Sequence, residues 1–157
     1  MSSPAKPISL RLSAIVHATE DSEKVIRTMR NVCQLGNSAH PVITRAKGHH
    51  GNQITTLVSH VKNARAAEEC LRDIWSRLNE LDKEIVRSSL ASRVDHSGTL
   101  FLRIDKQEAF RGRMHLQDSD PIKVGISFKT PKLKHDRIMD QIWVLLTEIS
   151  APAVGSA

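Results

Sequence analysis

A short alternating segment decides the fold class of this chain: Thr99-Leu100-Phe101-Leu102-Arg103-Ile104-Asp105-Lys106-Gln107. Successive side chains of an extended strand point to opposite faces, so Leu100, Leu102 and Ile104 share one face and Phe101 and Arg103 share the other. One face is therefore apolar, and the segment ends abruptly in charged residues. This pattern predicts a strand over residues 99–105 that buries one face against a core.

Four further strands are predicted on either side of this segment. Residues 8–17 alternate between apolar and polar side chains, and residues 122–128 alternate in the same way. Residues 41–46 and 54–61 flank a turn that contains glycine, and together they predict a hairpin. Because hairpin turns join antiparallel neighbours, we expect a mostly antiparallel sheet.

Helices are predicted between and after these strands, because apolar residues there recur at three- and four-residue spacing. The predicted ranges are about 20–33, 64–81, 83–90 and 138–149, with a short helical or irregular connection over 106–113. Thr19 is the predicted N-cap of the first helix, and Asp82 is the predicted N-cap of the third. Strands and helices are thus interleaved. The sequence predicts a single-domain α+β fold with a mostly antiparallel sheet packed against helices.

The chain has 157 residues, which is enough for one domain with its own core. We expect that domain to cover residues 8–150, between a flexible start at residues 1–7 and a flexible tail at residues 151–157. No apolar run approaches the roughly 18 residues that cross a membrane, so we predict a cytoplasmic protein with no membrane partner. The net charge of +6 favours a polyanionic partner.

Cys33 and Cys70 are the two cysteines of the chain, and each falls within an amphipathic helical pattern. We therefore expect two reduced thiols in the core rather than a disulfide. A zinc site would need about four ligands at motif spacing, and the sequence contains no CxxC motif. The sequence accordingly predicts neither a metal nor any other cofactor.

Gly48-His49-His50-Gly51-Asn52 forms the turn of the predicted hairpin. The two glycines can adopt a positive φ without steric cost, which allows a tight loop that presents His49, His50 and backbone N–H groups outward. Such a loop either grips a phosphate or is a turn with incidental histidines, and the residues alone leave both interpretations open. No carboxylate, serine or cysteine at motif spacing activates the histidines, so a catalytic or metal role is not favoured.

Charged residues follow the alternating strand. Arg103 and Asp105 share one strand face, and they form either a surface ion pair with Lys106 or a site where both cations contact phosphates while Asp105 orients them. Lys106, Arg111 and Arg113 follow an apolar strand, so we expect their side chains to face solvent. The candidate phosphate contacts in this half of the chain are Arg103, Lys106, Arg111, Arg113 and Lys123.

Aromatic residues are few, with three Phe, two Trp and no Tyr. Most of them fall at apolar positions of strands or helices, so they leave little for the stacking of RNA bases. A basic surface that is poor in aromatic residues is better suited to phosphate contacts with structured RNA. The chain also lacks a P-loop, an HExxH motif and the paired histidine motifs of phosphodiesterases, so no enzymatic activity is predicted.

The Gly48 to Asn52 loop and the Asp105-Lys106-Gln107 segment, in this order, resemble those of an archaeal family of RNA-binding proteins predicted to be exosome subunits. The resemblance covers residues 8–128 and departs at Gln53, where the family commonly has proline. It implies a fold similar to the ribosomal protein that binds 5S RNA in the large subunit. It also implies structured RNA as the partner and a link to the exosome or ribosome, and it favours His49, His50 and Asn52 as RNA contacts. The alternative is a protein-interaction module whose basic surface meets an acidic protein partner.

Overall fold

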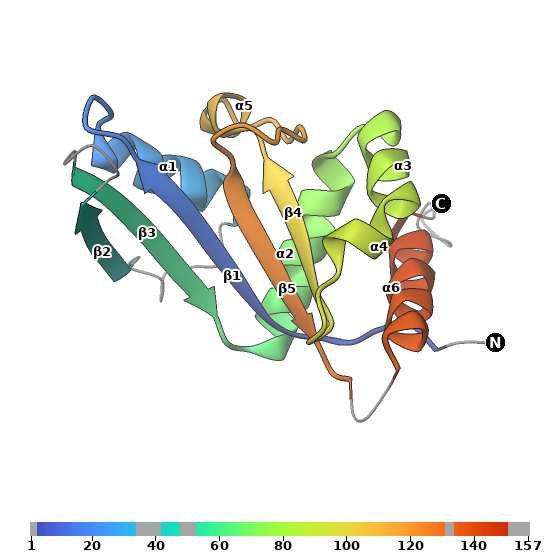
Figure 1. Cartoon of the computed structure of the whole chain (residues 1–157). Helices are drawn as coiled ribbons and strands as arrows, with labels where there is room; N and C mark the ends of the chain where they lie inside the picture. Colours follow the sequence, from blue (N-terminus) through green and yellow to red (C-terminus); the bar gives the residue numbers. More distant parts are fainter. Residues whose placement is uncertain (1–2, 34–41, 48–52, 131–133, 151–157) are drawn as a thin grey trace.

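The structure is a computed structural model that describes residues 3–33, 42–47, 53–130 and 134–150 (Figure 1). Five strands form one antiparallel sheet in the order β2-β3-β1-β5-β4. The strands are β1 (Pro7–Val16), β2 (Val42–Lys47), β3 (Gln53–Val61), β4 (Thr99–Ile104) and β5 (Ile122–Phe128). The predicted hairpin and the predicted α+β single-domain fold are confirmed. The likeness to the ribosomal protein stays a prediction.

Six helices are interleaved with the strands in the described part of the chain. They are α1 (Ser22–Val32), α2 (Ala64–Arg77), α3 (Glu80–Ser88), α4 (Leu90–Arg93), α5 (Lys106–Phe110) and α6 (His135–Ser150). The two predicted N-caps are wrong, because Asp21 caps α1 and Asn79 caps α3 through side-chain oxygens that accept backbone N–H groups. Asp82 lies inside the first turn of α3, where its carboxylate accepts the N–H of Leu116. Among the described residues, no helix combines the length and the apolar content of a membrane span.

One face of the sheet forms the core. Leu12 of β1 lies opposite Val124 of β5, which lies opposite Leu102 of β4, and all three side chains are buried. Because directly paired residues project to the same face, such cross-strand rows make a continuous apolar surface. Figure 1 shows α1 and α2 behind this surface, on the far side of the strands. In the part of the chain that the structure describes, no helix crosses the other face of the sheet.

The start of the domain differs from the predicted boundary. Ala5 is buried, and its N–H donates to the carbonyl of Gln141 in α6, so the predicted flexible start over residues 1–7 is too long. The pairing of β1 with β5 shifts between Pro7 and Ser9, which turns the Ile8 side chain outward instead of into the predicted apolar face. The predicted tail over residues 151–157 lies outside the described residues.

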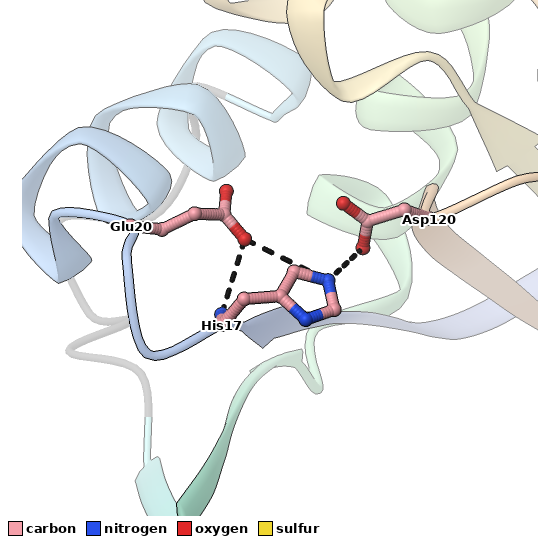
Figure 2. Close-up of side chains that lie close together, drawn as sticks. All are labelled: His17, Glu20 and Asp120. Carbon is pink, nitrogen blue, oxygen red and sulfur yellow. Dashed lines mark hydrogen bonds and ion pairs between the residues drawn. The ribbon is translucent and has the colours of Figure 1, made fainter. Parts of the chain in front are cut away.

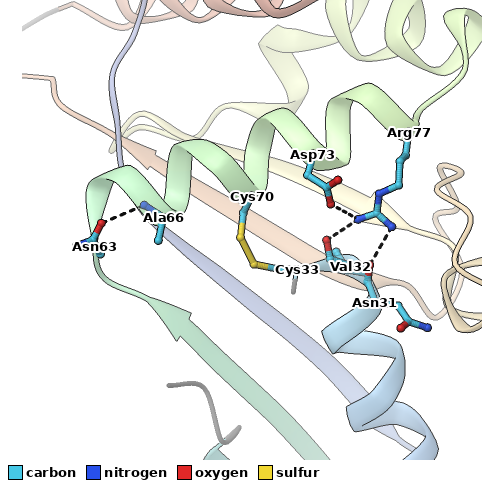
Figure 3. The surroundings of a disulfide bond; sticks show 8 residues. All are labelled: Asn31, Val32, Cys33, Asn63, Ala66, Cys70, Asp73 and Arg77. Atoms are coloured by element: carbon cyan, nitrogen blue, oxygen red, sulfur yellow. Dashed lines mark hydrogen bonds and ion pairs between the residues drawn. A yellow bond between two sulfur atoms is a disulfide. The ribbon is translucent and has the colours of Figure 1, made fainter. Parts of the chain in front are cut away.

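The two cysteines are joined. Cys33, just after α1, and Cys70 of α2 form a disulfide with their Cα atoms 5.6 Å apart (Figure 3), so the prediction of two reduced thiols is wrong. Helical spacing correctly predicts that each sulfur is buried, but it carries no information about which helices pack together. Arg77 of α2 reinforces the junction, because its guanidinium donates to the carbonyls of Asn31 and Val32 at 2.9 Å each. The carbonyls at the end of α1 are thereby satisfied by α2.

Candidate nucleic-acid interface

Three cations project from the uncovered side of the sheet. Arg11 of β1, Arg103 of β4 and Lys123 of β5 are exposed, and we call the surface they share with their strand neighbours the basic sheet face. Arg103 lies directly opposite Lys123, and Arg11 lies opposite Gly125 of the same strand β5. The structure therefore brings together two predicted phosphate contacts, Arg103 and Lys123, and adds Arg11.

The charge of the sheet is strongly one-sided. The five strands, all of which the structure describes, contain five Lys or Arg residues and no Asp or Glu, so they carry +5 of the net charge of +6. All acidic residues of the chain lie outside the strands. Like charges directly opposite each other in a sheet repel, so the Arg103 and Lys123 pair is left in need of an anion. Asp118 approaches Arg103 only at 4.0 Å and is itself 86% exposed.

The basic sheet face contains a hollow of about 440 Å³ at its β4 edge. It is lined by Ser92, Arg93, Phe101, Arg103, Asp118 and Lys123. Arg93 reaches this hollow from α4, where its Nε donates to the hydroxyl of Ser89 at 2.7 Å. Three cationic side chains thus surround one half-buried aromatic ring, with a single carboxylate at the rim. This arrangement can accept a ligand that combines negative charge with a flat apolar group.

Lys106 does not lie on this face. Its side chain is only 6% exposed, and its ammonium donates to the carbonyl of Ile15 at 2.7 Å and to both carboxylate oxygens of Asp120 at 3.0 Å. It also contacts the carboxylate of Glu20 at 3.3 Å. The prediction that Lys106 faces solvent is therefore wrong. The cation is desolvated and already neutralised, which leaves no donor for a phosphate.

Lys106 belongs to a cluster at the end of the sheet together with Glu20, Asp120 and His17. Figure 2 shows how His17, Glu20 and Asp120 lie in this cluster. The Nε2 atom of His17 lies 3.1 Å from Asp120 and 3.7 Å from Glu20. Partial burial raises the pKa of Asp120, but hydrogen bonds from Lys106 and His17 outweigh it and bring the pKa below its usual value. One oxygen or nitrogen from each of His17, Glu20 and Asp120 could approach a metal ion. The ammonium of Lys106 already occupies the carboxylates, so the cluster fixes the end of β1 to the segment before β5.

The remaining predicted cations lie on other elements. Arg111 and Arg113 follow α5 and are well exposed, but both approach the same carboxylate, Glu108, at 3.8 Å and 2.7 Å. Asp105 caps α5 by accepting the N–H of Glu108, so it makes neither the ion pair with Arg103 nor the orienting contact that the sequence predicts. His49, His50 and Asn52 lie outside the described residues, and their proposed contacts remain predictions.

Comparison with known proteins identifies the family. A family model described as RNA binding matches residues 9–128, which run from β1 to the end of β5. The chain belongs to this RNA-binding family. It is 26% identical over 138 residues to the RNA-binding protein PAB1135 of Pyrococcus abyssi, a match that covers 85% of this chain and 90% of the relative. It is 29% identical over 140 residues to an uncharacterized protein of Methanocaldococcus jannaschii, with 84% and 93% covered.

Solved structures agree with this assignment. The crystal structure of protein AF2318 from Archaeglobus fulgidus, of the family DUF54, superposes with a TM-score of 0.80 at 30% identity, covering 89% of this chain and 99% of that one. A DUF54 protein from Methanothermobacter thermautotrophicus gives a TM-score of 0.71 at 30% identity, covering 90% of this chain and 98% of that one. The relatives named here are archaeal, as the sequence resemblance implies.

Sequence reasoning missed two side chains of the basic sheet face. Arg11 lies at an outward-facing position of the first predicted strand, and Phe101 lies at an outward-facing position of the strand predicted over residues 99–105. The signal that could have identified Arg11 was its outward-facing position in the predicted strand over residues 8–17, which contains no acidic residue. The alternation of residues 99–105 places Phe101 on the same face as Arg103, but of the two only Arg103 was predicted as a candidate contact.

Proposed function

We propose that this chain is a non-enzymatic RNA-binding protein whose basic sheet face holds structured RNA through phosphate contacts. The observation that carries the proposal is the alignment of Arg11, Arg103 and Lys123 on three neighbouring strands that contain no acidic residue. Membership of an RNA-binding family supports RNA as the polyanion. Phosphate contacts give affinity and orientation without reading sequence, which suits a surface where cations outnumber aromatic groups.

The place of action is part of the same proposal. The resemblance to predicted exosome subunits supports a role beside the exosome or the ribosome in the cytoplasm. Arg111 and Arg113, together with the Gly48 to Asn52 loop, are proposed as secondary contacts to the same RNA. Arg111 and Arg113 share one carboxylate, so we assign them a smaller contribution than the basic sheet face.

Salt dependence of binding tests the proposal. A hairpin RNA and a highly acidic protein are titrated with the purified chain over a range of salt concentrations, and both affinities are measured by fluorescence anisotropy. If the basic sheet face neutralises about three phosphates of double-stranded RNA and Arg111 and Arg113 together neutralise about one more, the logarithm of the affinity should fall with the logarithm of the salt concentration at a slope near −4. An RNA affinity that is absent, that does not change with salt or that is weaker than that for the acidic protein would contradict the proposal.

Incubation of the same hairpin RNA with the purified chain tests the non-enzymatic part. The Ser92 hydroxyl in the hollow donates to the carbonyl of Ser89, and among the described residues it makes no hydrogen bond to Asp118. In the described part of the chain no general base is therefore placed to activate it, so we expect the RNA to remain intact. Cleavage that persists through further purification and disappears in a variant of the basic sheet face would show that the chain is an enzyme.

A further inference from the structure

Phe101 occupies an unusual place for an aromatic residue in a sheet. It is half-buried on the uncovered face, directly opposite Gly125 of β5. A Cβ atom at position 125 would lie 3.2 Å from Cε1 of the Phe101 ring, which is tighter than ordinary packing, and 3.5 Å from Cδ1, which is ordinary contact. Glycine weakens a strand interior and often marks a place where another group approaches the backbone closely. Gly125 therefore lets the ring lie against the sheet.

Cations surround this ring on the same face. Arg103 lies two residues further along β4, about 7 Å away along the strand, and Lys123 lies directly opposite Arg103. Arg11 lies opposite Gly125 on the other side of β5, and Arg93 joins the hollow from α4. The ring and the cations Arg93, Arg103 and Lys123 therefore line the same hollow. An aromatic ring and neighbouring cations are the two elements of sites that bind single-stranded nucleic acid.

Other aromatic side chains do not combine these two elements. Among the described residues, Phe110 and Trp143 are also partly exposed, but they belong to helices α5 and α6 and not to the sheet. Phe128 and Trp75 are buried in the core. Of these described aromatic residues, Phe101 is the one that lies on the basic sheet face.

We propose that the hollow around Phe101 takes one unpaired nucleotide of the bound RNA, with its base stacked on Phe101 and its phosphate on Arg103 and Lys123. The inference rests on the proposed function and deepens it, because it names the part of the RNA that the basic sheet face selects. A paired base is stacked within its helix and cannot reach the ring, so the nucleotide must come from a loop, a bulge or an end. Stacking on a ring tolerates any base, so no sequence preference is implied.

Two RNA probes and two variants test this inference. The probes are a hairpin with unpaired adenosines in its loop and a fully paired duplex with the same number of phosphates. Phe101→Leu keeps an apolar side chain over Gly125 but removes the aromatic face, and Phe101→Trp enlarges that face. Affinities of the wild type and both variants for both probes are measured at one salt concentration, after thermal unfolding has shown that each variant is folded.

The expected result is a selective loss. Phe101→Leu should bind the hairpin about tenfold more weakly than the wild type and should bind the duplex equally well, because stacking on one base is removed and phosphate contacts remain. Phe101→Trp should retain the hairpin affinity. Equal hairpin affinities for Phe101→Leu and the wild type, or equal losses on both probes, would overturn the inference alone. A wild-type protein that binds neither probe would overturn the proposed function and this inference with it.

Discussion

The basic sheet face and the cluster at the end of the sheet use the same kinds of side chain in opposite ways. On the face, Arg103 and Lys123 stand opposite each other, and the Asp118 carboxylate approaches Arg103 only at 4.0 Å from an exposed position. In the cluster, Lys106 is buried and bonded to the carboxylates of Asp120 and Glu20. The two regions are joined by only a few residues of chain, since Arg103 precedes Lys106 by three positions.

The difference shows that the number of cations along a segment does not locate a binding surface. A buried lysine between two carboxylates stabilises the fold and presents no charge to a ligand. An exposed cation on a strand contributes little to stability but presents its charge to a ligand. The positions of the acidic residues are therefore as important for locating a binding surface as the positions of the basic residues. On this reasoning the cluster is part of the scaffold, and the basic sheet face is the surface that meets RNA.

The helical layer provides the largest test of this division between scaffold and surface. The disulfide closes a loop of 37 residues, so Cys33→Ala with Cys70→Ala should lower the free energy of unfolding by about 4 kcal/mol. RNA affinity, measured where the variant is still folded, should not change. Urea unfolding of the wild type with and without a reductant provides the control. An unfolding free energy that responds to neither treatment would indicate two reduced thiols.

Lys106 and Lys123 give the next largest contrast. Lys106→Met leaves the carboxylates of Asp120 and Glu20 without their cation, so the free energy of unfolding should fall by about 2 kcal/mol, less than for a fully buried pair because both acids are partly exposed. Lys123→Met removes an exposed cation and should change stability by less than about 0.5 kcal/mol. Urea unfolding compares the two variants. Equal stability losses would remove the distinction between the two regions.

Asp120 makes the stability of the cluster depend on pH. Partial burial raises the pKa of Asp120, but hydrogen bonds from Lys106 and His17 lower it further, so the folded-state pKa lies below the usual 3.8. The stabilisation is therefore present above pH 3.8 and is lost as the pH falls through the folded-state pKa. Asp120→Asn should destabilise the protein at neutral pH, and the difference from the wild type should shrink at low pH. A difference that is constant over the whole range would show that the carboxylate charge contributes nothing.

Arg111 and Arg113 should show a smaller effect on RNA binding than the basic sheet face. Glu108 offsets one of their two charges, so Arg111→Ala with Arg113→Ala should lower RNA affinity by less than about fivefold and reduce the salt slope by about 1. The matched variant is Arg103→Ala with Lys123→Ala, which should reduce the slope by about 2. A larger loss in the first pair than in the second would move the main contact to the segment after α5.

Local patterns predict the strands and the long helix because period and turn residues act over a few positions. Alternation places Leu100, Leu102 and Ile104 in the core, and the turn residues place β2 beside β3. The position of Lys106 could not be predicted in this way, because Glu20 is 86 residues away and reaches it only through the tertiary fold. The disulfide could not be predicted either, because two buried cysteines do not indicate which helices pack against each other. For the candidate site, the sequence predicted Arg103 and Lys123 but not their neighbours Arg11 and Phe101.

The most direct test of the account compares two triple variants that remove the same charge. One is Arg11→Ala with Arg103→Ala and Lys123→Ala on the basic sheet face, and the other replaces the exposed helical residues Arg30, Arg65 and Arg72 by Ala. Affinity for a hairpin RNA is measured over a range of salt concentrations. We expect the first variant to bind about 100-fold more weakly at physiological salt, with a salt slope shallower by about 3, and the second to stay close to the wild type. Equal losses in both variants, or a loss confined to the helical one, would contradict the assignment of RNA binding to the basic sheet face.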